Sequence, residues 1–583
     1  MKALQHINKY FYKYRYRLIA GIIISILSKY FAVKVPEVVK NSINIADDYR
    51  TGVVSNIEIV EDELLYNISI IIGLAFLSGF FTFLMRQTII VTSRLIEFDL
   101  KNEIFQQYER LSVNFYKKNR TGDLMNRISE DVGKVRMYVG PAVMYTINML
   151  VLFSVAIYKM IHIDITLTLY TLIPFPLLSI SVFYLSKIIH KRSTIVQEYL
   201  SHLTTFGQEI FSGINVIKSY NTEQNMIDSF TNLSNTSKDK NIHLYKAQAL
   251  FFPSMILLIG ISNLIVLYVG GLQYINGVIS IGTIAEFIMY VNMLTWPVAI
   301  VGWVTSTTQQ AEASQKRINE FLKHEPEIKS GDKQPEKLEG KIVFDNVSLV
   351  YDDTNITALN KISFTINSGE TVAILGKTGS GKSSIINLVA RMYDPSKGSV
   401  IVDGIDLKEQ NLYEFRKHIG IVPQDPFLFS DSIANNIRFG IEKADQKMIE
   451  NAAKDAVIHD NISGFKEGYE TVLGERGITI SGGQKQRISI ARALIKNPEI
   501  LLFDDCLSAV DTETEELILK NLQRILDKKT ALIVSHRISS AKYADRIIVI
   551  ENGKIIQEGN HNNLIETEGY YKDLYEQQLL EKE

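Results

Sequence analysis

The first half of the chain consists largely of long hydrophobic runs, and the second half does not. Six runs are long enough to cross a bilayer as helices, because a spanning helix needs about 20 apolar residues and satisfies its own backbone hydrogen bonds. They lie at residues 18–39, 68–92, 139–161, 165–186, 247–270 and 281–304. Prolines in or beside these runs predict kinks. These are Pro141, Pro174, Pro176, Pro253 and Pro297.

The distribution of charge around the runs predicts their orientation. Lys9, Lys13, Arg15 and Arg17 precede the first run, whereas Asp and Glu dominate the loop between the first two runs. Because Lys and Arg concentrate on the cytosolic side, the N-terminus and the second half of the chain are expected in the cytosol. The sequence thus predicts a multi-pass protein of the cell (inner or plasma) membrane. The first residues do not resemble a removable signal peptide.

Two long cytosolic connections, at about residues 95–138 and 187–246, are charged and helical in character. They are long enough to continue the membrane helices well into the cytosol. Their turns fall near residues 114–132 and 207–223. The turns could be solvated hairpins, but their distance from the membrane favours docking onto the soluble domain.

The second half contains a phosphate-binding pattern. The apolar segment 371–375 predicts a buried strand, and the residues from Gly376 to Ser383, GKTGSGKS, follow it directly before a helical segment. Glycines in such a loop let backbone N–H groups turn towards phosphates at a helix N-terminus. Lys382 is expected to bridge the β- and γ-phosphates of ATP, and Ser383 to bind Mg²⁺.

Two later segments complete this pattern. The apolar strand 500–503 ends at Asp504 and Asp505, which predicts Asp504 as a second Mg²⁺ ligand. Ser481, Gly482 and Gly483 begin another helix and provide a second anion site. Because both loops are tied to separate helices of one domain, the second site is best used on the ATP of a partner chain.

Length and composition limit the number of domains, the class of partner and the role of the cysteine. A chain of 583 residues is too long for one core. We expect a transmembrane domain at 1–310, a linker at 311–339 and a nucleotide-binding domain at 340–583. A net charge of −2 and a pI near 6.6 argue against nucleic acid as a partner. The only cysteine, Cys506, cannot form an intramolecular disulfide and is expected to be a buried filler.

The phosphate loop, the ISGGQKQR segment and the ILLFDD strand, in this order, resemble the ATP-binding cassette transporters. The resemblance covers nearly the whole chain and is to half-size exporters, which carry the membrane domain first. It implies an all-α, six-helix transmembrane domain followed by an α/β phosphate-loop NTPase cassette. It also implies that two such chains form a dimer.

The resemblance assigns roles to further residues. Tyr351 would stack on adenine, Gln424 would contact Mg²⁺ and the attacking water, and His536 would contact the γ-phosphate. The segment 508–511 matches a loop that crosses the dimer interface, and the GERG segment, 474–477, matches one that senses the membrane domain. The nucleotide-binding set comprises Tyr351, Gly376, Lys377, Thr378, Gly379, Ser380, Gly381, Lys382, Ser383, Ser384, Gln424, Ser481, Gly482, Gly483, Gln484 and Asp511. The metal-binding set is Ser383, Gln424 and Asp504, and the catalytic set is Asp505, His536 and Gln424. The structural alternatives are a plain strand tyrosine, a solvated glutamine and a structural histidine.

One position departs from the family pattern. The general base is normally a glutamate directly after the Mg²⁺ aspartate, whereas this chain has Asp505. The carboxylate is one methylene short, which predicts weak hydrolysis with ATP binding intact. The chain could therefore be the mainly regulatory half of a heterodimer or form a homodimer that still turns over.

The implied mechanism is alternating access driven by ATP clamped between two cassettes. The six runs exclude a soluble ATPase, and fusion of both domains argues against an importer. The substrate is expected to be lipophilic or amphiphilic, with a drug, a lipid and a peptide all open, and membrane lipid is an expected partner. Lys29, Lys34, Arg86 and Lys159 fall in or near the apolar runs, where charge is costly and often functional. An anionic amphiphile would be favoured if Lys29, Lys34 or Arg86 lined the cavity.

Overall fold

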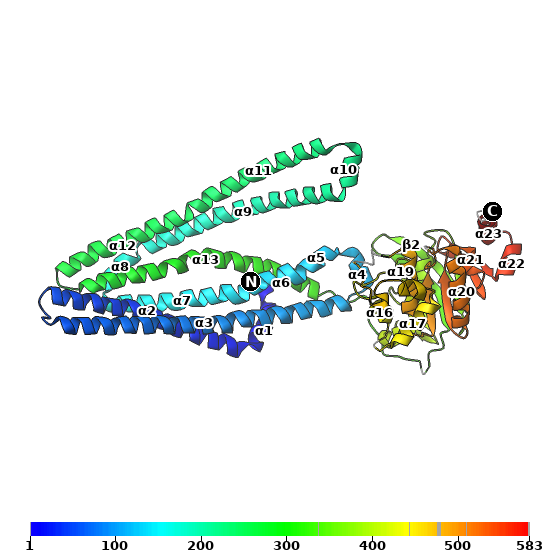
Figure 1. Ribbon diagram of the computed structural model, residues 1–583, viewed down its shortest axis with the longest axis horizontal. Helices are drawn as coiled ribbons and strands as arrows, with labels where there is room; N and C mark the ends of the chain where they lie inside the picture. The colour runs from blue at the N-terminus through cyan, green and yellow to red at the C-terminus, as the bar shows by residue number, and fades with distance from the viewer. Residues whose placement is uncertain (1, 336, 442, 475–479, 509, 581–583) are drawn as a thin grey trace. The chain divides into compact units, whose positions relative to one another are not determined.

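The computed structural model describes residues 2–335, 337–441, 443–474, 480–508 and 510–580. The chain divides into two compact units. The first is formed by residues 1–109 and 122–324, and the second by residues 110–121 and 325–583. The first unit is helical and the second is a mixed α/β domain (Figure 1), which confirms the predicted fold class.

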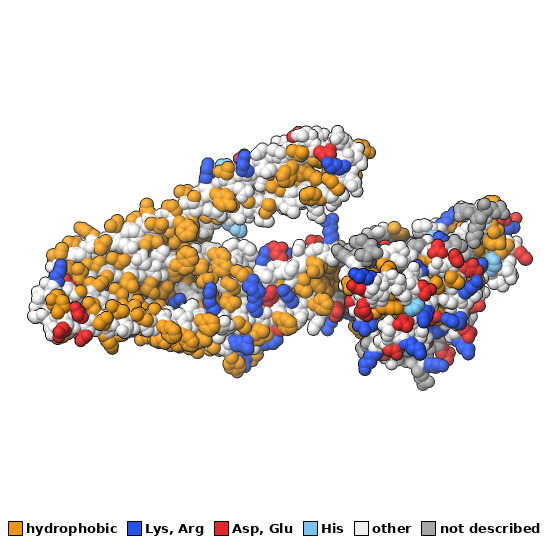
Figure 2. All heavy atoms as spheres, in the orientation of Figure 1, with side chains coloured by type: hydrophobic (Ala, Val, Ile, Leu, Met, Phe, Trp, Pro, Cys, Tyr) orange, Lys and Arg blue, Asp and Glu red, His pale blue; other side chains and the backbone are white. Residues whose placement is uncertain are grey.

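Among the residues that the structure describes, six long apolar helical stretches account for most of the first unit, and each contains one of the six predicted spans. They are 15–50, 57–110, 121–163, 165–212, 223–275 and 281–322. The short elements η1 (Ala3–Ile7) and α1 (Asn8–Lys13) precede the first stretch, and α10 (Ile214–Tyr220) lies between the fourth and the fifth. The stretches themselves comprise α2 (Arg15–Arg50), α3 (Ile57–Arg110), α5 (Thr121–Asn126), η2 (Arg127–Asp131), α6 (Val132–Met137), η3 (Tyr138–Ala142), α7 (Val143–Ile163), α8 (Ile165–Leu172), α9 (Pro174–Ser212), α11 (Glu223–Ala249), α12 (Phe251–Ile275) and α13 (Ile281–Leu322). Figure 2 shows hydrophobic side chains spread over the outside of these helices, as expected of surfaces that face lipid.

Two of the predicted prolines, Pro174 and Pro141, coincide with irregularities in these helices, whereas Pro297 and the further proline Pro36 lie inside continuous helices. The fourth stretch breaks between α8 and α9 directly before Pro174, and Pro141 lies in the π-helical turn η3. Pro297 lies inside α13, and Pro36 inside α2. A proline removes one backbone donor and crowds the preceding turn, so the breaks follow from the sequence.

The helix interior combines apolar packing with a group of paired charges. Val33 of α2 packs with Leu152 of α7 and Phe287 of α13 in one buried cluster. Near the non-cytosolic end of the same three helices, the carboxylate of Glu286 accepts a hydrogen bond from Tyr290 at 2.9 Å and pairs with Lys40 at 3.3 Å.

Glu37 is the second carboxylate of this group. It pairs with Lys159 of α7 at 2.8 Å and with Lys34 of its own helix at 3.3 Å. The two carboxylates therefore tie α2 to α7 and to α13.

The predicted cytosolic extensions are helical. The helices α9 and α11 run side by side beyond the apolar spans and are joined by α10 (Figure 1). The second predicted turn, 207–223, coincides with the end of α9, α10 and the start of α11. In the first predicted turn, the short helix α4 (Val113–Lys118) belongs to the second compact unit.

The second unit contains two sheets. One is antiparallel with the order β2-β1-β4-β5, and the other has the order β10-β9-β3-β8-β7-β6, in which β9, β3, β8, β7 and β6 are parallel. The strands are β1 (Ile342–Tyr351), β2 (Ile356–Ile366), β3 (Thr371–Leu375), β4 (Lys397–Val402), β5 (Ile405–Asp406), β6 (Ile419–Val422), β7 (Ile500–Asp504), β8 (Thr530–Val534), β9 (Arg546–Glu551) and β10 (Lys554–Gly559). The helices are α14 (Lys382–Val389), α15 (Leu412–Lys417), α16 (Ile433–Arg438), α17 (Gln446–Asp455), α18 (His459–Ser463), η4 (Gly468–Glu470), α19 (Gly482–Leu494), α20 (Thr512–Leu526), α21 (Ile538–Ala541), α22 (His561–Glu566) and α23 (Tyr570–Leu580).

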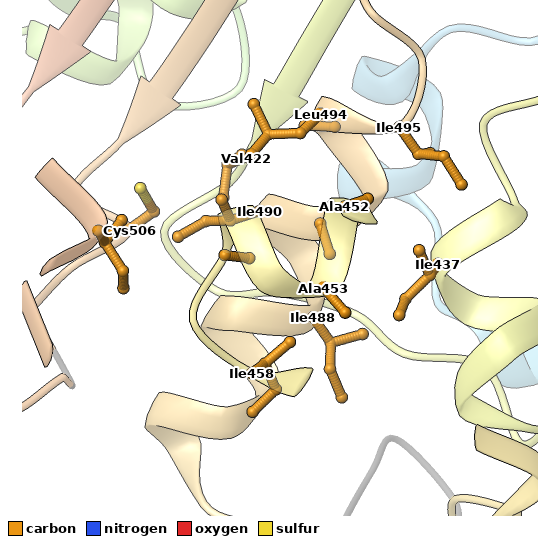
Figure 3. Packing of buried hydrophobic residues seen from close by; sticks show 14 of the residues in the cluster. Val422, Ile437, Ala452, Ala453, Ile458, Ile488, Ile490, Leu494, Ile495 and Cys506 are labelled. Carbon is orange, nitrogen blue, oxygen red and sulfur yellow. The ribbon is translucent and has the colours of Figure 1, made fainter. Parts of the chain in front are cut away.

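Two buried clusters hold the functional loops of this unit in place. In one, Val422 at the end of β6 packs with Ile488 and Ile490 of α19 (Figure 3). Cys506 is buried in the same cluster, in the filler role that the sequence predicts. The other cluster lies between the two sheets and contains Phe344 stacked on Phe364. The strand ends and the start of α19 are thus fixed by apolar packing.

Candidate nucleotide site

The parallel strands end at one edge of the sheet, and the predicted site residues follow these ends. Ile374 of β3 and Asp504 of β7 both lie beside Val534 of β8, and Val422 of β6 lies beside Phe503. The phosphate loop, Asp505, His536 and Gln424 therefore leave the sheet at the same edge. In an open α/β sheet, ligands bind outside the carboxyl ends of the strands.

The phosphate loop depends on glycine at two positions. Gly376 has φ 152° and Gly381 has φ 102°, which L side chains rarely adopt. A Cβ at Gly376 would lie 2.1 Å from the carbonyl oxygen of Ile550, and one at Gly381 would lie 2.2 Å from that of Ala358. The loop therefore packs directly on neighbouring backbone, and between these glycines Lys377, Thr378 and Gly379 are exposed.

Lys382 turns back over this loop. Its Nζ donates to the carbonyl oxygens of Gly376 at 2.7 Å and of Lys377 at 2.9 Å. Burial lowers the pKa of Lys382 to about 8, opposed in part by the charges of Asp505 and Asp504. The hydroxyl of Ser380 is buried in the same loop without a hydrogen-bond partner among the described residues. A phosphate oxygen would satisfy both groups.

Two of the predicted metal ligands are adjacent. Ser383 Oγ in the first turn of α14 donates to Asp504 Oδ1 at the end of β7, at 2.8 Å. Burial raises the pKa of Asp504, and the hydrogen bond from Ser383 opposes that shift. Hard oxygen ligands of this kind suit Mg²⁺, so these residues fit the ion. Gln424 is exposed after β6, at the same edge of the sheet.

Asp505 and His536 are brought together. The backbone N–H of Asp505 donates to the carbonyl oxygen of Val534 at 2.9 Å, which holds Asp505 at φ 44°. Burial raises the pKa of Asp505, while His536, whose backbone N–H donates to this carboxylate, opposes the shift. Burial, together with the charge of Lys382, lowers the pKa of His536. The half-buried carboxylate of Asp505 and the half-buried imidazole of His536 thus lie at the same edge of the sheet as the phosphate loop.

Tyr351 lies at the end of β1, next to the helix that follows the phosphate loop. Its hydroxyl and Ser384 Oγ share a hydrogen bond of 2.9 Å, and its ring meets Tyr393 edge to face at 5.2 Å. Lys117 of α4 lies over both rings, 4.9 Å from the centroid of Tyr351 and 5.0 Å from that of Tyr393. Such cation–π contacts fix the orientation of the rings. The sequence predicts the turn that contains Lys117 but gives no signal for this contact.

Ser481 is the N-cap of α19. Its hydroxyl accepts a hydrogen bond from the N–H of Gln484 at 3.3 Å, and Gln484 Oε1 accepts one from the N–H of Ser481 at 3.0 Å. This capping box leaves Ser481 and Gly482 exposed, with Gly483 beside them. Across the described ranges, no hydrogen bond joins this helix end to the phosphate loop. The two predicted anion sites of one chain are therefore not linked by a hydrogen bond in the part of the chain that the structure describes.

The predicted interface loop ends at another helix cap. The carboxylate of Asp511 accepts a hydrogen bond from the N–H of Thr514 at 2.9 Å and caps α20. Asp511 is exposed. In the predicted GERG segment, residues 475–477 lie outside the described residues.

The structure also shows an ion pair between a buried carboxylate and a half-buried arginine that the sequence does not predict. Glu515 of α20 is 2% exposed and accepts hydrogen bonds from Arg537 at 2.6 Å, Ser539 at 2.7 Å and Ser540 at 2.9 Å. Arg537 also donates to the carbonyl oxygen of Ser508 at 3.2 Å. The pair links the residue after His536 to the predicted interface loop. The acidic run around Glu515 is typical of a solvated helix face, so the sequence offered no signal for it.

Comparison with known proteins gives concordant matches for both halves of the chain. Residues 8–298 match the family described as the ABC transporter transmembrane region, and residues 359–508 match the family described as ABC transporter. The multidrug resistance-like ATP-binding protein MdlA of Buchnera aphidicola subsp. Schizaphis graminum is 36% identical and covers 100% of this chain and 99% of its own length.

Two further matches extend over nearly the full length. The probable multidrug resistance ABC transporter ATP-binding/permease protein YheI of Bacillus subtilis is 34% identical, over 99% of this chain and 98% of its own. A solved structure of a bacterial Atm1-family ABC exporter with ATP bound has the same fold, with a TM-score of 0.80 at 24% identity over 97% of this chain and 98% of that one. The chain therefore belongs to the ATP-binding cassette transporters, and it is a multi-pass membrane protein whose cytosolic cassette couples ATP hydrolysis to transport.

Proposed function

We propose that this chain is one half of a dimeric exporter that moves a lipophilic or amphiphilic molecule out of the cell. ATP is clamped between the phosphate loop of one cassette and the Ser481 end of α19 in the other. The observation that carries the proposal is the separation of the two anion sites. Ser481 and Gly482 are exposed and make no hydrogen bond to the phosphate loop in the described part of the chain. Both residues are therefore available to bind the nucleotide held by a partner chain.

Each side chain of the site has a role in this proposal. Lys382 and Ser380 bind phosphate oxygens, Tyr351 stacks on adenine, and Ser383, Asp504 and Gln424 hold Mg²⁺. The ion, when bound, neutralises charge on the transferred phosphoryl group. Asp505 accepts the proton of the attacking water, and His536 contacts the γ-phosphate as a hydrogen-bond donor.

The pKa shifts are consistent with these roles. Burial raises the pKa of Asp505, which makes the carboxylate a better proton acceptor than an exposed aspartate. Burial lowers the pKa of Lys382, and the charges of Asp505 and Asp504 compensate only in part, so bound phosphates would further stabilise its protonated form. Closure of the dimer therefore depends on the γ-phosphate, and its loss on hydrolysis loosens the clamp.

The relatives support an amphiphilic cargo. The names of MdlA and YheI refer to multidrug resistance, and the six spans of this chain are rich in aromatic and aliphatic side chains. Compounds that partition into lipid reach such a membrane domain directly. We therefore include membrane lipid among the molecules that the protein contacts.

A second candidate is the mainly regulatory half of a heterodimeric exporter. The observation that favours it is Asp505, which has a shorter side chain than glutamate and a left-handed backbone at φ 44°. A displacement of about 1 Å in a reacting group can cost about 100-fold in rate. In that case this chain binds ATP, and its intact Ser481 helix end completes a faster site on the partner.

Cross-linking tests the clamp. In a Cys506→Ala background, which removes the only native cysteine, Ser481→Cys and Thr378→Cys place one thiol on each side of the expected interface. A cross-linked dimer is expected with MgATP and not with MgADP, and Ser481→Cys alone serves as the control. Failure to cross-link at saturating MgATP, in a protein that still binds ATP, would contradict the homodimeric clamp and leave the heterodimeric candidate.

A further inference from the structure

Lys29 lies near the middle of the first membrane span. At a rise of 1.5 Å per residue, it is about 15 Å from either end of the span 18–39. A lysine side chain is too short to carry its ammonium group that far, so Lys29 cannot reach either interface by snorkelling. Its charge must be accommodated inside the helix bundle.

Two neighbours on α2 define the face that Lys29 occupies. Ser25, four residues earlier, donates to Asn148 Oδ1 of α7 at 2.9 Å. Val33, four residues later, is 1% exposed and packs with Leu152 of α7. Because residues four apart lie on one helix face, Lys29 lies on the face of α2 that is directed at α7. It is half-buried there.

The other cations in the spans are accounted for. Lys34 and Lys159 both pair with Glu37, at 3.3 Å and 2.8 Å. Arg86 is exposed on α3 and lies close enough to the cytosolic end of its span to snorkel. Lys29 differs from Lys34 and Lys159 because it makes no ion pair and no side-chain hydrogen bond with any residue in the part of the chain that the structure describes. It differs from Arg86 because it lies too deep in its span to snorkel.

A second copy of the chain could not supply the missing counter-ion at this depth. The only carboxylates in the six predicted spans are Glu37 and Glu286, and both lie near the non-cytosolic end and are paired with lysines. A charge that is half-buried in a membrane span without a partner is unfavourable. The anion that balances Lys29 must therefore come from outside the protein.

We propose that Lys29 binds the anionic group of the transported molecule, so that the exported substrate is an anionic amphiphile. The inference rests on the export function proposed above and specifies its substrate class. The charge of Lys29 selects the anionic group of the substrate, and apolar contacts with the membrane domain bind its hydrophobic body without strict shape requirements.

A matched pair of fluorescent probes tests the charge requirement. Anilinonaphthalene sulfonate carries a negative charge, and N-phenyl-1-naphthylamine has the same ring system without it. The whole protein is placed in nanodiscs of phosphatidylcholine alone, so that no anionic lipid competes, and empty nanodiscs provide the background. We expect Lys29→Gln to weaken binding of the sulfonate by about 10-fold or more, the effect of losing one charge-assisted contact, and to leave the neutral probe unchanged.

Two further variants separate the charge from the fold. Lys29→Arg is expected to retain the preference for the sulfonate. Lys34→Gln is the matched control, because Glu37 keeps Lys159 as its partner, and binding of both probes is expected to stay within about twofold of the original. Unchanged sulfonate binding in Lys29→Gln, or an equal loss for both probes, overturns the inference.

ATP-driven uptake of the same probes into inverted vesicles distinguishes this inference from the export function. If the sulfonate is taken up and Lys29→Gln abolishes this uptake, both the anion site and the export function are supported. Binding that depends on Lys29 without any ATP-driven uptake contradicts the export function and leaves the anion site standing. Uptake of both probes that is indifferent to Lys29→Gln overturns the site and supports export.

Discussion

Lys382 Nζ donates to the carbonyl oxygen of Gly376 at 2.7 Å, so the lysine folds back on its own phosphate loop. This arrangement has a consequence for pH. Burial lowers the pKa of Lys382 to about 8, whereas bound phosphates favour the protonated form and keep it charged to higher pH. Nucleotide binding is therefore accompanied by proton uptake above the lowered pKa.

We expect the Kd for MgATP to be flat below about pH 8 and to rise by up to about tenfold per pH unit above it. Below that pH the lysine is protonated with or without nucleotide, so no proton is exchanged. The Kd of a fluorescent ATP analogue is measured at a series of pH values from about 6.5 to about 9.5. This range extends roughly one to two pH units on either side of the lowered pKa. Lys382→Arg, which does not titrate in this range, should show no such slope. An equally steep slope in that variant would contradict the assignment.

The side chain at position 505 is expected to control the rate of hydrolysis. Asp505→Glu extends the carboxylate by one methylene and should raise kcat by about 10-fold to 100-fold, with the KM for ATP little changed. Asp505→Asn should lower kcat to background. The measurement is steady-state ATPase activity of the whole protein in lipid.

Asp505→Glu should also carry a modest stability cost. Aspartate tolerates the left-handed backbone at φ 44° better than glutamate does, and the difference is on the order of 1 kcal/mol. A lower midpoint of thermal unfolding together with a higher turnover is the expected combination. If Asp505→Asn hydrolyses ATP as fast as the original chain, then Asp505 is not the base.

Ser481 has two roles that different substitutions can separate. Ser481→Ala removes the cap of α19 and should destabilise the protein by about 1 kcal/mol, whereas Ser481→Asn retains a capping oxygen. Both should reduce MgATP-dependent dimer formation, because both remove the hydroxyl that is offered to the partner's nucleotide. Analytical ultracentrifugation of the detergent-solubilised chain tests this, with thermal unfolding as the parallel measurement. Normal dimerisation of Ser481→Asn would show that the hydroxyl is not required.

Glu515 and Arg537 are expected to act as one unit on turnover. Arg537→Ala removes the hydrogen bond to the carbonyl oxygen of Ser508, and Glu515→Ala removes the carboxylate that holds the Arg537 guanidinium in place. Each should lower kcat without a matching rise in the KM for ATP, because neither residue lies in the phosphate loop. The double variant should lose no more than the stronger single variant, as expected of directly coupled residues. Additive losses would indicate independent roles.

The features that the sequence predicts well are those encoded locally. A membrane span shows in a run of consecutive apolar residues, and the phosphate loop shows in the spacing of Gly376, Gly379 and Gly381 between a strand and a helix. Parallel strands place their carboxyl ends together, so the shared edge of Asp504 and His536 also follows once the strands are known.

The features that it does not predict depend on long-range partners. Nothing in the sequence pairs Lys40 with Glu286 or sets Lys117 over Tyr351, since these residues meet only after the chain folds. The left-handed backbone of Asp505 is likewise imposed by its hydrogen bond to β8. The same holds for Lys29: its charge is evident in the sequence, but only the structure shows that it has no partner among the described residues.

The pairing of Lys40 with Glu286 also bears on how the protein is made. Lys40 directly follows the first span to be synthesised, whereas Glu286 belongs to the last span. Four spans are therefore synthesised after Lys40 before its carboxylate partner is made. Glu286, which is 1% exposed at the end, enters the bilayer as an isolated acid unless α13 meets α2 as it inserts. Biogenesis of this membrane domain is therefore tied to its final helix, and a nascent chain that stops before α13 retains an unbalanced charge that quality-control proteases can recognise.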